Sequence, residues 1–383
     1  MKNRGLMTTS PPAARAVPFF NYQAAFTAQE DAFLAIVRDV VRRGAFIQQR
    51  DLAEFEERLA AYLNVKYAFG VGNATDGLII AFRAAGIGPG DEVIFPSHTM
   101  VASPAAAVHA GATPVPVDCG PDHLIDPRAV EAAITSRTRA ILPVHLNGRT
   151  CAMEPLLEIA RRHGLLIIED AAQALGSRYK ERHAGAFGLA AAFSFYPAKI
   201  LGCFGDGGAV VTNDPGVART IRLLRDHGRN EAGEVECWGL NSRLDNLQAA
   251  ILDFQFKDYG RIIARRRALA AAYDAGLGDL PQLRLPPAPG SHPDHFDVFQ
   301  NYEIEADRRD QLREFLKERG IGTLIQWGGK AVHQFAGLGL DVSLPATEEL
   351  FRRCLMLPMN MMVSDEDADY VCAQVREFYR GSR

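Results

Sequence analysis

FSFYPAKILGCFGDGGAVVTND, residues 193–214, is the stretch from which the architecture of this chain can be read. Two short apolar runs of strand type flank a turn with Lys199 and a loop with four glycines. Such a loop lets the backbone approach a ligand closely. The neutral amine of a lysine can form an imine with a carbonyl cofactor if its site lowers the pKa. A lone lysine beside glycines is more often an ordinary surface residue, so other segments must add support.

Short apolar runs of strand type also occur on both sides of this stretch. From about residue 67 onward, short apolar runs alternate with amphipathic helical stretches. This alternation predicts a mostly parallel sheet with crossover helices, which is an α/β fold. The runs outside the opening stretch are YAFGVG (67–72), DEVIFP (91–96), ATPVPVD (112–118), RAILPVHL (139–146) and LLIIED (165–170).

The domain organisation follows from the segments around this alternation. Apolar residues at helical spacing in 29–63 predict a helical entry segment, and a proline-rich connection follows the helix that begins near Asn246. With 48% hydrophobic and 23% charged positions, the chain can bury a large core. We expect a partly loose N-terminal segment (1–20), a large domain (21–250) and a small C-terminal domain (251–383).

A second piece of a site lies in LLIIEDAAQALG, residues 165–176. A carboxylate at the end of a buried strand is costly unless it meets a cation. A pyridinium nitrogen is such a partner, and Asp170 would keep that nitrogen protonated. Gln173 would then hydrogen-bond the ring hydroxyl. On this segment alone, Asp170 as a helix N-cap is an equally good interpretation.

The third piece is GVGNATDGL, residues 70–78, which has the form of a strand-to-helix turn. Free backbone N–H groups and the helix dipole at such a turn bind phosphate without Lys or Arg. The Ser194 hydroxyl is a further candidate phosphate ligand. Such turns are common, but all three pieces fall at carboxyl ends of strands in one predicted sheet, where α/β proteins bind their ligands.

Together with PSHTMVAS (96–103) and LNSRLDNLQAA (240–250), these segments resemble the DegT/DnrJ/EryC1/StrS family of sugar aminotransferases. The likeness runs from about Val17 to the C-terminus, with the blocks in the family's order and approximate spacing. It implies the fold-type I architecture of the aspartate aminotransferase superfamily. That architecture has a large domain, whose mostly parallel mixed sheet is sandwiched by helices, and a smaller α+β C-terminal domain.

The resemblance also implies the cofactor pyridoxal 5′-phosphate and the residues that bind it. Lys199 is the implied catalytic residue and holds the cofactor as a Schiff base. Asp170 pairs with the pyridine nitrogen, and Gln173 contacts the ring hydroxyl. The phosphate is implied to bind Ser194 and the turn formed by Ala74, Thr75 and Asp76.

An intimate homodimer with active sites at the subunit interface is implied as well. In the family the NSR segment crosses to the partner's site, so Asn241 would reach the neighbour's cofactor phosphate, with Arg243 nearby. By its own chemistry, Asn241 fits a local cap equally well. Met100 stands where the family usually has an aromatic residue that stacks on the pyridine ring, and a thioether can also pack on a ring face.

The segment TLIQWGGKAVHQFAGLG, residues 323–339, departs from the family pattern. Trp327 could stack on a sugar or base and Lys330 could meet phosphate, although a loop with a structural tryptophan fits equally well. The expected substrate contacts are His98, Arg243, Trp327, Lys330 and His333.

The implied reaction moves an amino group from L-glutamate or glutamine to a keto-sugar, and pyridoxamine phosphate is the cofactor form between its two halves. The expected acceptor is a nucleotide-linked 3- or 4-keto-deoxyhexose, in amino-sugar biosynthesis for surface polysaccharide or a secondary metabolite. A small phosphorylated ketone and a non-nucleotide keto-sugar stay open as acceptors. A non-catalytic, cofactor-binding regulator also stays open, whereas the dehydratase branch of the fold replaces the lysine with histidine.

Composition argues against several other classes of protein. A net charge of −4 gives no general attraction to nucleic acid or anionic lipid. The six cysteines are scattered without a CxxC pair, and no apolar run reaches the ~18 residues of a membrane span. The sequence contains no HxH or HExxH motif, the spacings that would indicate a metal site. GCFGDGG precedes a strand instead of opening a helix, which excludes a dinucleotide fingerprint. We therefore expect a cytoplasmic enzyme without metal, nucleic-acid or membrane partners.

Overall fold

The computed structural model describes residues 15–381. Most of the expected loose segment 1–20 therefore lies outside the described residues. Its described end is packed, because Val17 is 1% exposed and its N–H donates to the Gly320 carbonyl at 2.8 Å. Val17 belongs to the hydrophobic core of the small domain, so the chain contacts that domain before it enters the large one. No helix within the described range is long and apolar enough to cross a membrane.

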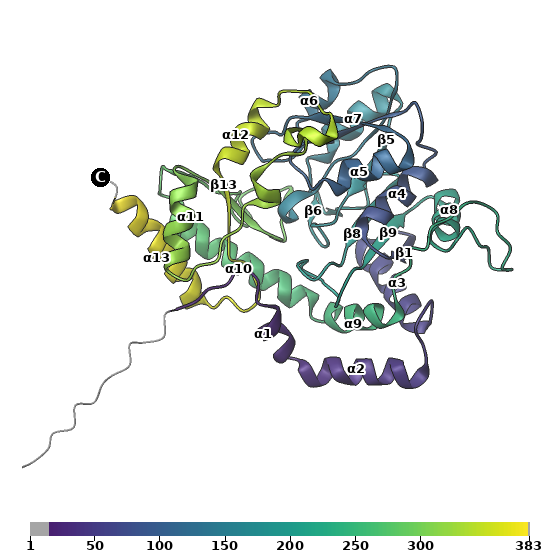
Figure 1. Ribbon diagram of the computed structural model, residues 1–383, viewed down its shortest axis with the longest axis horizontal. Helices are drawn as coiled ribbons and strands as arrows, with labels where there is room; N and C mark the ends of the chain where they lie inside the picture. The colour runs from purple at the N-terminus through teal and green to yellow at the C-terminus, as the bar shows by residue number, and fades with distance from the viewer. Residues whose placement is uncertain (1–14, 382–383) are drawn as a thin grey trace, which may run out of the picture.

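A mixed sheet forms the centre of the large domain (Figure 1). Within the described residues its seven strands run in the order β1-β9-β8-β5-β4-β2-β3. Four neighbouring pairs are parallel, and β9 alone runs against its neighbours. The mostly parallel sheet that the β/α alternation predicts is confirmed. The strands are β1 (Tyr67–Val71), β2 (Glu92–Pro96), β3 (Thr113–Val117), β4 (Thr138–Ile141), β5 (Leu166–Asp170), β8 (Ala190–Ser194) and β9 (Gly208–Thr212).

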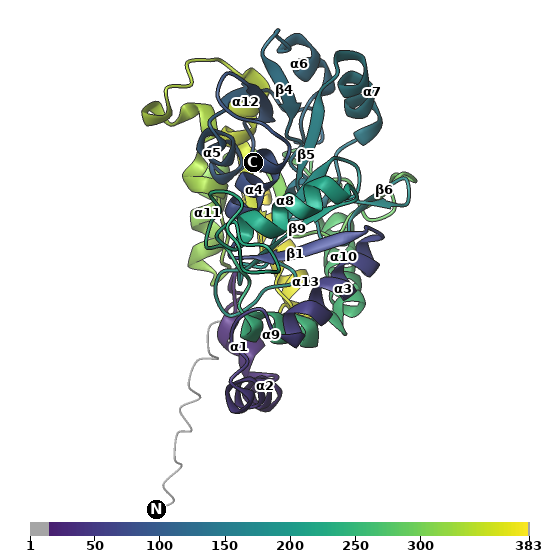
Figure 2. The ribbon, with the colours of Figure 1, turned by 90° about the vertical axis from the view of Figure 1, so that its right-hand side faces the viewer.

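Helices cover both faces of this sheet, as Figures 1 and 2 show. Successive side chains of a strand point to opposite faces, so each buried strand feeds two cores. In β8, Ala192 packs on the face covered by α4 (Ala74–Ala84), α5 (Ala102–Ala110) and α8 (Pro215–Arg225). Phe193 packs on the other face, covered by α3 and α9. The helices of that second face are α3 (Arg50–Leu63), α6 (Pro127–Ala132), α7 (Met153–His163) and α9 (Asn246–Phe256).

The long helix α10 (Tyr259–Leu277) joins the two domains. Its first residue, Tyr259, packs in the large-domain core, whereas Leu269 packs in the small-domain core. The small domain combines the antiparallel strands β10, β12 and β13 with helices α11 and α13. The remaining elements are α1 (Tyr22–Thr27), α2 (Glu30–Arg43), η1 (Leu146–Gly148), β6 (Arg178–Tyr179), β7 (Arg182–His183), β10 (Leu283–Arg284), β11 (His295–Phe296), β12 (Tyr302–Ala306), α11 (Arg309–Glu318), η2 (Gln326–Gly329), η3 (Val332–Gln334), η4 (Ala336–Leu338), α12 (Pro345–Arg353), β13 (Cys354–Leu357) and α13 (Asp365–Arg380).

The register of the sheet brings the predicted site segments to one edge. Parallel β5 and β8 pair Asp170 with Ala192, so the ends of these two strands lie side by side. Across antiparallel β9, Gly208 pairs with Ser194 on one side and with Val71 on the other. The carboxyl ends of β1, β5 and β8 therefore meet, which is where α/β folds bind ligands.

Candidate active site

Lys199 lies in a turn directly after β8, and the small domain holds this turn in place. Gln300 accepts the Ile200 N–H and donates to the Ala198 carbonyl, both at 2.8 Å. Burial lowers the pKa of Lys199 to about 8, although the negative charge of Asp170 opposes the shift. The amine therefore reaches its neutral, nucleophilic form near physiological pH.

A cavity of about 690 Å³ opens beside Lys199. Its walls come from the Lys199 turn, α1, the start of α2, the facing parts of α9 and α10, and residues 359–362. Small-molecule sites commonly have volumes of about 300–1,000 Å³. The space next to the lysine is therefore sufficient for a small molecule, although Asp170, Gln173 and Ser194 do not line this cavity.

Asp170 ends β5 and is 6% exposed. Ser103 donates its hydroxyl to Asp170 Oδ2 at 2.6 Å, and the Ala172 N–H donates to Oδ1 at 3.1 Å. A turn follows Asp170 instead of a helix, so the N-cap interpretation is wrong. A buried carboxylate of this kind needs a cationic partner. Asp170 is thus suited to hold the protonated nitrogen of a pyridine ring.

Gln173 follows in that turn, and its amide orientation can be deduced from its neighbours. The Asn147 N–H, which can only donate, points at Gln173 Oε1 at 2.8 Å. The Asn301 amide lies 3.4 Å from the same oxygen. Because the oxygen is engaged on that side, the amide nitrogen of Gln173 is left to donate elsewhere. A ring hydroxyl oxygen is the acceptor that the sequence predicts for it.

The start of α4 and the end of β8 form a cradle suited to phosphate. Asn73 caps α4 by accepting the Asp76 N–H at 2.8 Å, and the first-turn N–H groups of Ala74 and Thr75 have no partner within the helix. A Cβ on Gly208 would lie 2.7 Å from the Asn73 carbonyl carbon and 2.8 Å from the Ala74 nitrogen. Gly208 of β9 also pairs with Ser194 of β8 in the sheet. Ser194 and the α4 N-terminus are therefore brought together, as predicted.

The NSR segment supports this cradle from the same chain. The Ser242 hydroxyl accepts the Gly72 N–H at 3.0 Å, at the turn that leads into α4. Arg243 donates to Asp226 at 2.8 Å, while Asn241 is exposed. Sequence patterns did not single out Ser242, although it lies between the two residues that were expected to bind.

The predicted substrate contacts fall into two groups. His98 is buried, and its Nδ1 lies 2.9 Å from the His123 carbonyl, so it donates there. His333 is also buried, with its Nδ1 2.7 Å from the Ser97 hydroxyl. Both histidines therefore hold loops together, and a direct contact with substrate is not shown for either.

Trp327 and Lys330 form the second group, whereas Met100 was expected to pack on the cofactor ring. The Trp327 ring packs 5.6 Å from that of His98, centroid to centroid. Lys330 is exposed and lines a shallow groove with Val101, which follows Met100. Met100 itself is 52% exposed. These side chains lie next to the end of β2, because the Val332 N–H donates to the Ser97 carbonyl at 3.2 Å.

The donor set fits pyridoxal phosphate and offers no alternative metal centre. Lys199, Asp170, Gln173 and the phosphate cradle supply an amine, a carboxylate, an amide donor and backbone N–H groups around one strand edge. Among residues 15–381, no cluster of three or more His, Cys, Asp or Glu side chains is arranged to hold a metal ion. The arrangement therefore matches the chemistry of the predicted cofactor at each of its polar positions.

Comparison with known proteins identifies the family. The model of the DegT/DnrJ/EryC1/StrS aminotransferase family matches residues 27–376. A dTDP-3-amino-3,4,6-trideoxy-alpha-D-glucose transaminase of Streptomyces venezuelae is 46% identical over 94% of this chain and 96% of its own. A "pleiotropic regulatory protein" of Geobacillus stearothermophilus is 40% identical over 95% and 99%.

Solved structures lead to the same family. S. venezuelae DesV, determined in complex with a ketimine intermediate, superposes with a TM-score of 0.90 at 45% identity, covering 95% of this chain and 98% of DesV. NtdA from Bacillus subtilis, with bound PMP, superposes with a TM-score of 0.86 at 28% identity, covering 98% and 87%. The chain therefore belongs to the DegT/DnrJ/EryC1/StrS aminotransferase family and is a pyridoxal-phosphate-dependent aminotransferase.

Proposed function

We propose that this aminotransferase moves an amino group from L-glutamate or glutamine to a nucleotide-linked 3- or 4-keto-deoxyhexose in amino-sugar biosynthesis. The observation that carries the proposal is the placement of Lys199 next to Asp170 at an edge that also bears a phosphate cradle. The acceptor class is supported by relatives named as dTDP-amino-sugar transaminases, one of them 46% identical.

The residues of the chain divide the chemistry among them. When bound, pyridoxal phosphate supplies an electron-poor ring that withdraws electrons from the carbon bearing the amino group. Asp170 holds the proton on the ring nitrogen, and Gln173 donates to the ring hydroxyl oxygen. After the amino donor has displaced it from the cofactor, Lys199 Nζ would take the proton from the α-carbon of the donor, because its lowered pKa keeps a fraction of the amine neutral.

The phosphate anchor positions the ring against the lysine. We propose that the Ala74 and Thr75 N–H groups and the Ser194 hydroxyl hold the phosphate, with Asp76 closing the first turn of α4. The helix N-terminus favours the anion. Met100 would pack on the open face of the ring.

The nucleotide end of the substrate would meet the segment 323–339. Lys330 is exposed beside an apolar groove, and a cation there suits a diphosphate. Trp327 offers a ring for a sugar or a base. His98 and His333 would act indirectly, by holding Trp327 and the η3 turn.

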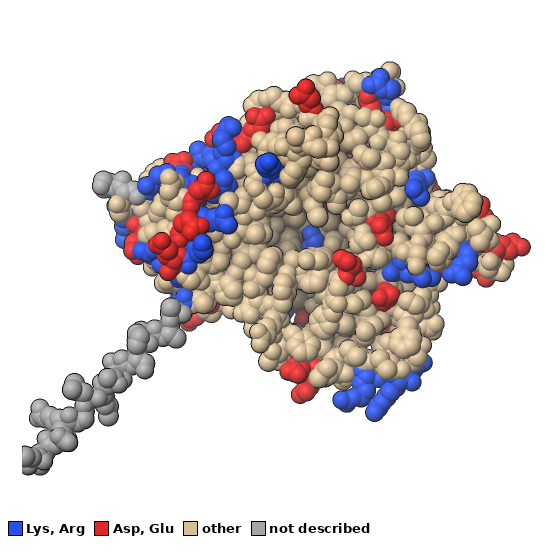
Figure 3. Space-filling view, viewed as in Figure 1, with Lys and Arg blue, Asp and Glu red and all other residues tan. Residues whose placement is uncertain are grey.

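A homodimer is part of the proposal. The face in Figure 3 has a hollowed centre with few charged side chains. The chain also exposes large apolar residues, among them Tyr196, Phe204 and Trp238 with 51%, 45% and 95% exposure. Exposed apolar surface of this kind favours a protein partner. A second copy that covers this surface would let exposed Asn241, with Arg243 behind it, serve the neighbouring site.

The test uses purified protein reconstituted with pyridoxal phosphate. L-glutamate is expected to replace the cofactor band at about 410–430 nm with one near about 330 nm, and Lys199→Ala should abolish the change. The protein should then aminate a dTDP-linked 3-keto or 4-keto hexose, with the product identified by mass spectrometry. Amination of only a small phosphorylated ketone would contradict the sugar assignment. A cofactor band that no amino donor changes would favour a regulator.

A further inference from the structure

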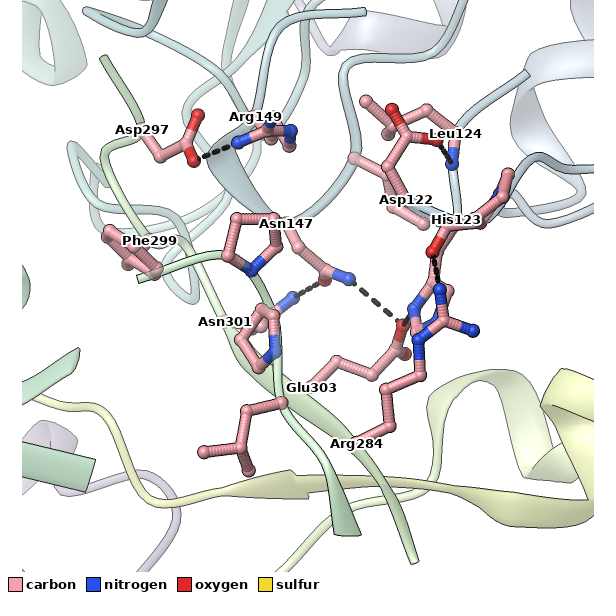
Figure 4. Close-up of a pocket in the computed structure, with 15 residues that line it drawn as sticks. Asp122, His123, Leu124, Asn147, Arg149, Arg284, Asp297, Phe299, Asn301 and Glu303 are labelled. Atoms are coloured by element: carbon pink, nitrogen blue, oxygen red, sulfur yellow. Dashed lines mark hydrogen bonds and ion pairs between the residues drawn. The ribbon is translucent and has the colours of Figure 1, made fainter. Parts of the chain in front are cut away.

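A partly buried polar cluster joins the two domains beside Gln173, and Figure 4 shows three of its members, Asn147, Asn301 and Glu303, around an interdomain pocket. Asn147 lies at its centre, in the η1 turn of the large domain. Its backbone N–H donates to Gln173 Oε1 at 2.8 Å. Its side chain reaches Glu303 of β12 and Gln326 of η2, both in the small domain.

The Asn147 side chain uses both of its polar atoms across the domain boundary. Its Nδ2 donates to Glu303 Oε1 at 3.2 Å. Its Oδ1 accepts from Asn301 Nδ2 at 2.8 Å and from Gln326 Nε2 at 3.2 Å. All three partners belong to the small domain, so Asn147 links that domain to Gln173, in addition to the longer direct contact of Asn301 Nδ2 with Gln173 Oε1 at 3.4 Å.

The turn that presents Asn147 has a demanding conformation. Asn147 has φ 55°, in the left-handed region, which asparagine tolerates better than most residues. At Gly148, φ is 87° and a Cβ would lie 2.6 Å from the Gln300 nitrogen. The turn is therefore pressed against the small domain by backbone packing as well as by side chains.

Glu303 supplies the charge at the far end of the cluster. It is 2% exposed, and a buried carboxylate is stable only with strong partners. Burial by itself would raise the pKa of Glu303, but His98 and His123 outweigh that effect and keep it well below its usual range. Glu303 therefore stays ionised and fixes the Asn147 amide in one orientation.

We infer that Asn147 is a positioning residue. It couples the packing of the small domain against the large domain to the hydrogen bond that Gln173 donates to the cofactor ring. Only when the small domain holds the Asn147 side chain does the backbone N–H stay aimed at Gln173 Oε1. That contact leaves the Gln173 amide nitrogen facing the ring. If the small domain moves away, the amide of Gln173 is free to turn and the ring loses a donor. The inference rests on the proposed role of Gln173.

The experiment compares Asn147→Gly with Asn64→Gly. Both asparagines have positive φ, at 55° and 54°, so glycine preserves the backbone in each. Asn64 is exposed at the end of α3 and serves as the matched control. The readouts are the dissociation constant of pyridoxal phosphate and the pH midpoint of the absorption band of the bound cofactor.

Asn147→Gly is expected to weaken cofactor binding about fivefold, the value of one net hydrogen bond, and to shift the pH midpoint. Asn64→Gly should leave both readouts unchanged. The decisive comparison is made in a Gln173→Ala background, where Asn147→Gly should cause no further change because the two residues act as one unit. Additive effects, or an Asn147→Gly protein that behaves like the control, would overturn the inference. Neither readout needs a sugar acceptor, so a failure of the sugar assignment would be seen separately.

Discussion

The reactivity of Lys199 offers the sharpest test of the active-site assignment. With a pKa of about 8, roughly one amine in eleven is neutral at pH 7. At the ordinary value of 10.5, only about one in 3,000 would be neutral. The structure therefore predicts an enrichment of neutral amine of about 300-fold. Replacing Asp170 should enlarge this effect, because its negative charge holds the pKa of Lys199 up.

Competitive labelling of the cofactor-free protein measures this directly. A trace of acetic anhydride is added between pH 6.5 and 11, and each lysine is quantified by peptide mass spectrometry. Partial burial reduces the absolute reactivity of Lys199, so the pH midpoint is the informative quantity. We expect Lys199 to reach half of its plateau near pH 8 and to do so at lower pH in Asp170→Asn.

Lys180 is the internal control. A hydrogen bond to Glu154 raises the pKa of Lys180 above its ordinary value, so it should react half-maximally above pH 10.5. A Lys199 midpoint that coincides with that of Lys180 would refute the argument from burial. An upward shift of the midpoint in Asp170→Asn would refute the argument that these two residues face each other.

Three further outcomes follow from the contacts. Gly208→Ala should weaken pyridoxal phosphate binding at least about tenfold in a fluorescence titration, because its Cβ would press on the phosphate cradle, while Gly260→Ala, with nothing within 4 Å, should not. Ser103→Ala should lower kcat about tenfold with little change in KM for glutamate, since it removes the donor to Asp170 Oδ2; an unchanged kcat would contradict that role. Although burial opposes it, contact with two small-domain carboxylates raises the pKa of His123 to about 9. The stabilisation from its charge is present below about pH 6.5 and is lost as pH rises through about 9, so urea unfolding should show a decline over that window that His123→Gln lacks.

Much of the fold can be predicted from local sequence patterns, and the cofactor follows from the family resemblance that these patterns carry together. The alternation of apolar runs with amphipathic stretches indicates the sheet, since burial on both faces requires continuous apolar strands. The turn after β1 and the segments around Asp170 and Lys199 are likewise recognisable, because a strand end, a helix start and a glycine loop each depend on neighbouring residues only.

The partners of those residues could not be predicted in the same way. Ser103 lies 67 positions before Asp170 in the chain, and the Asn147 side chain meets Glu303 across a separation of 156 positions. Both contacts depend on crossover connections and on how the domains pack, which no local pattern encodes. The same reason explains His98, which was expected to contact substrate but is buried beside Trp327.

Glu169 and Asp170 show what the local sequence determines and what only the tertiary packing determines. Local sequence places both carboxylates at the end of one buried strand, and strand geometry requires that they point to opposite faces. Packing alone assigns the faces: Glu169 is taken up by the N–H groups of Gly185, Phe187 and Gly188 at 2.6–2.8 Å, whereas Asp170 remains beside Lys199. The residue types and their order were therefore set locally, and the carboxylate that lies beside Lys199 was selected by the layers that close around the sheet.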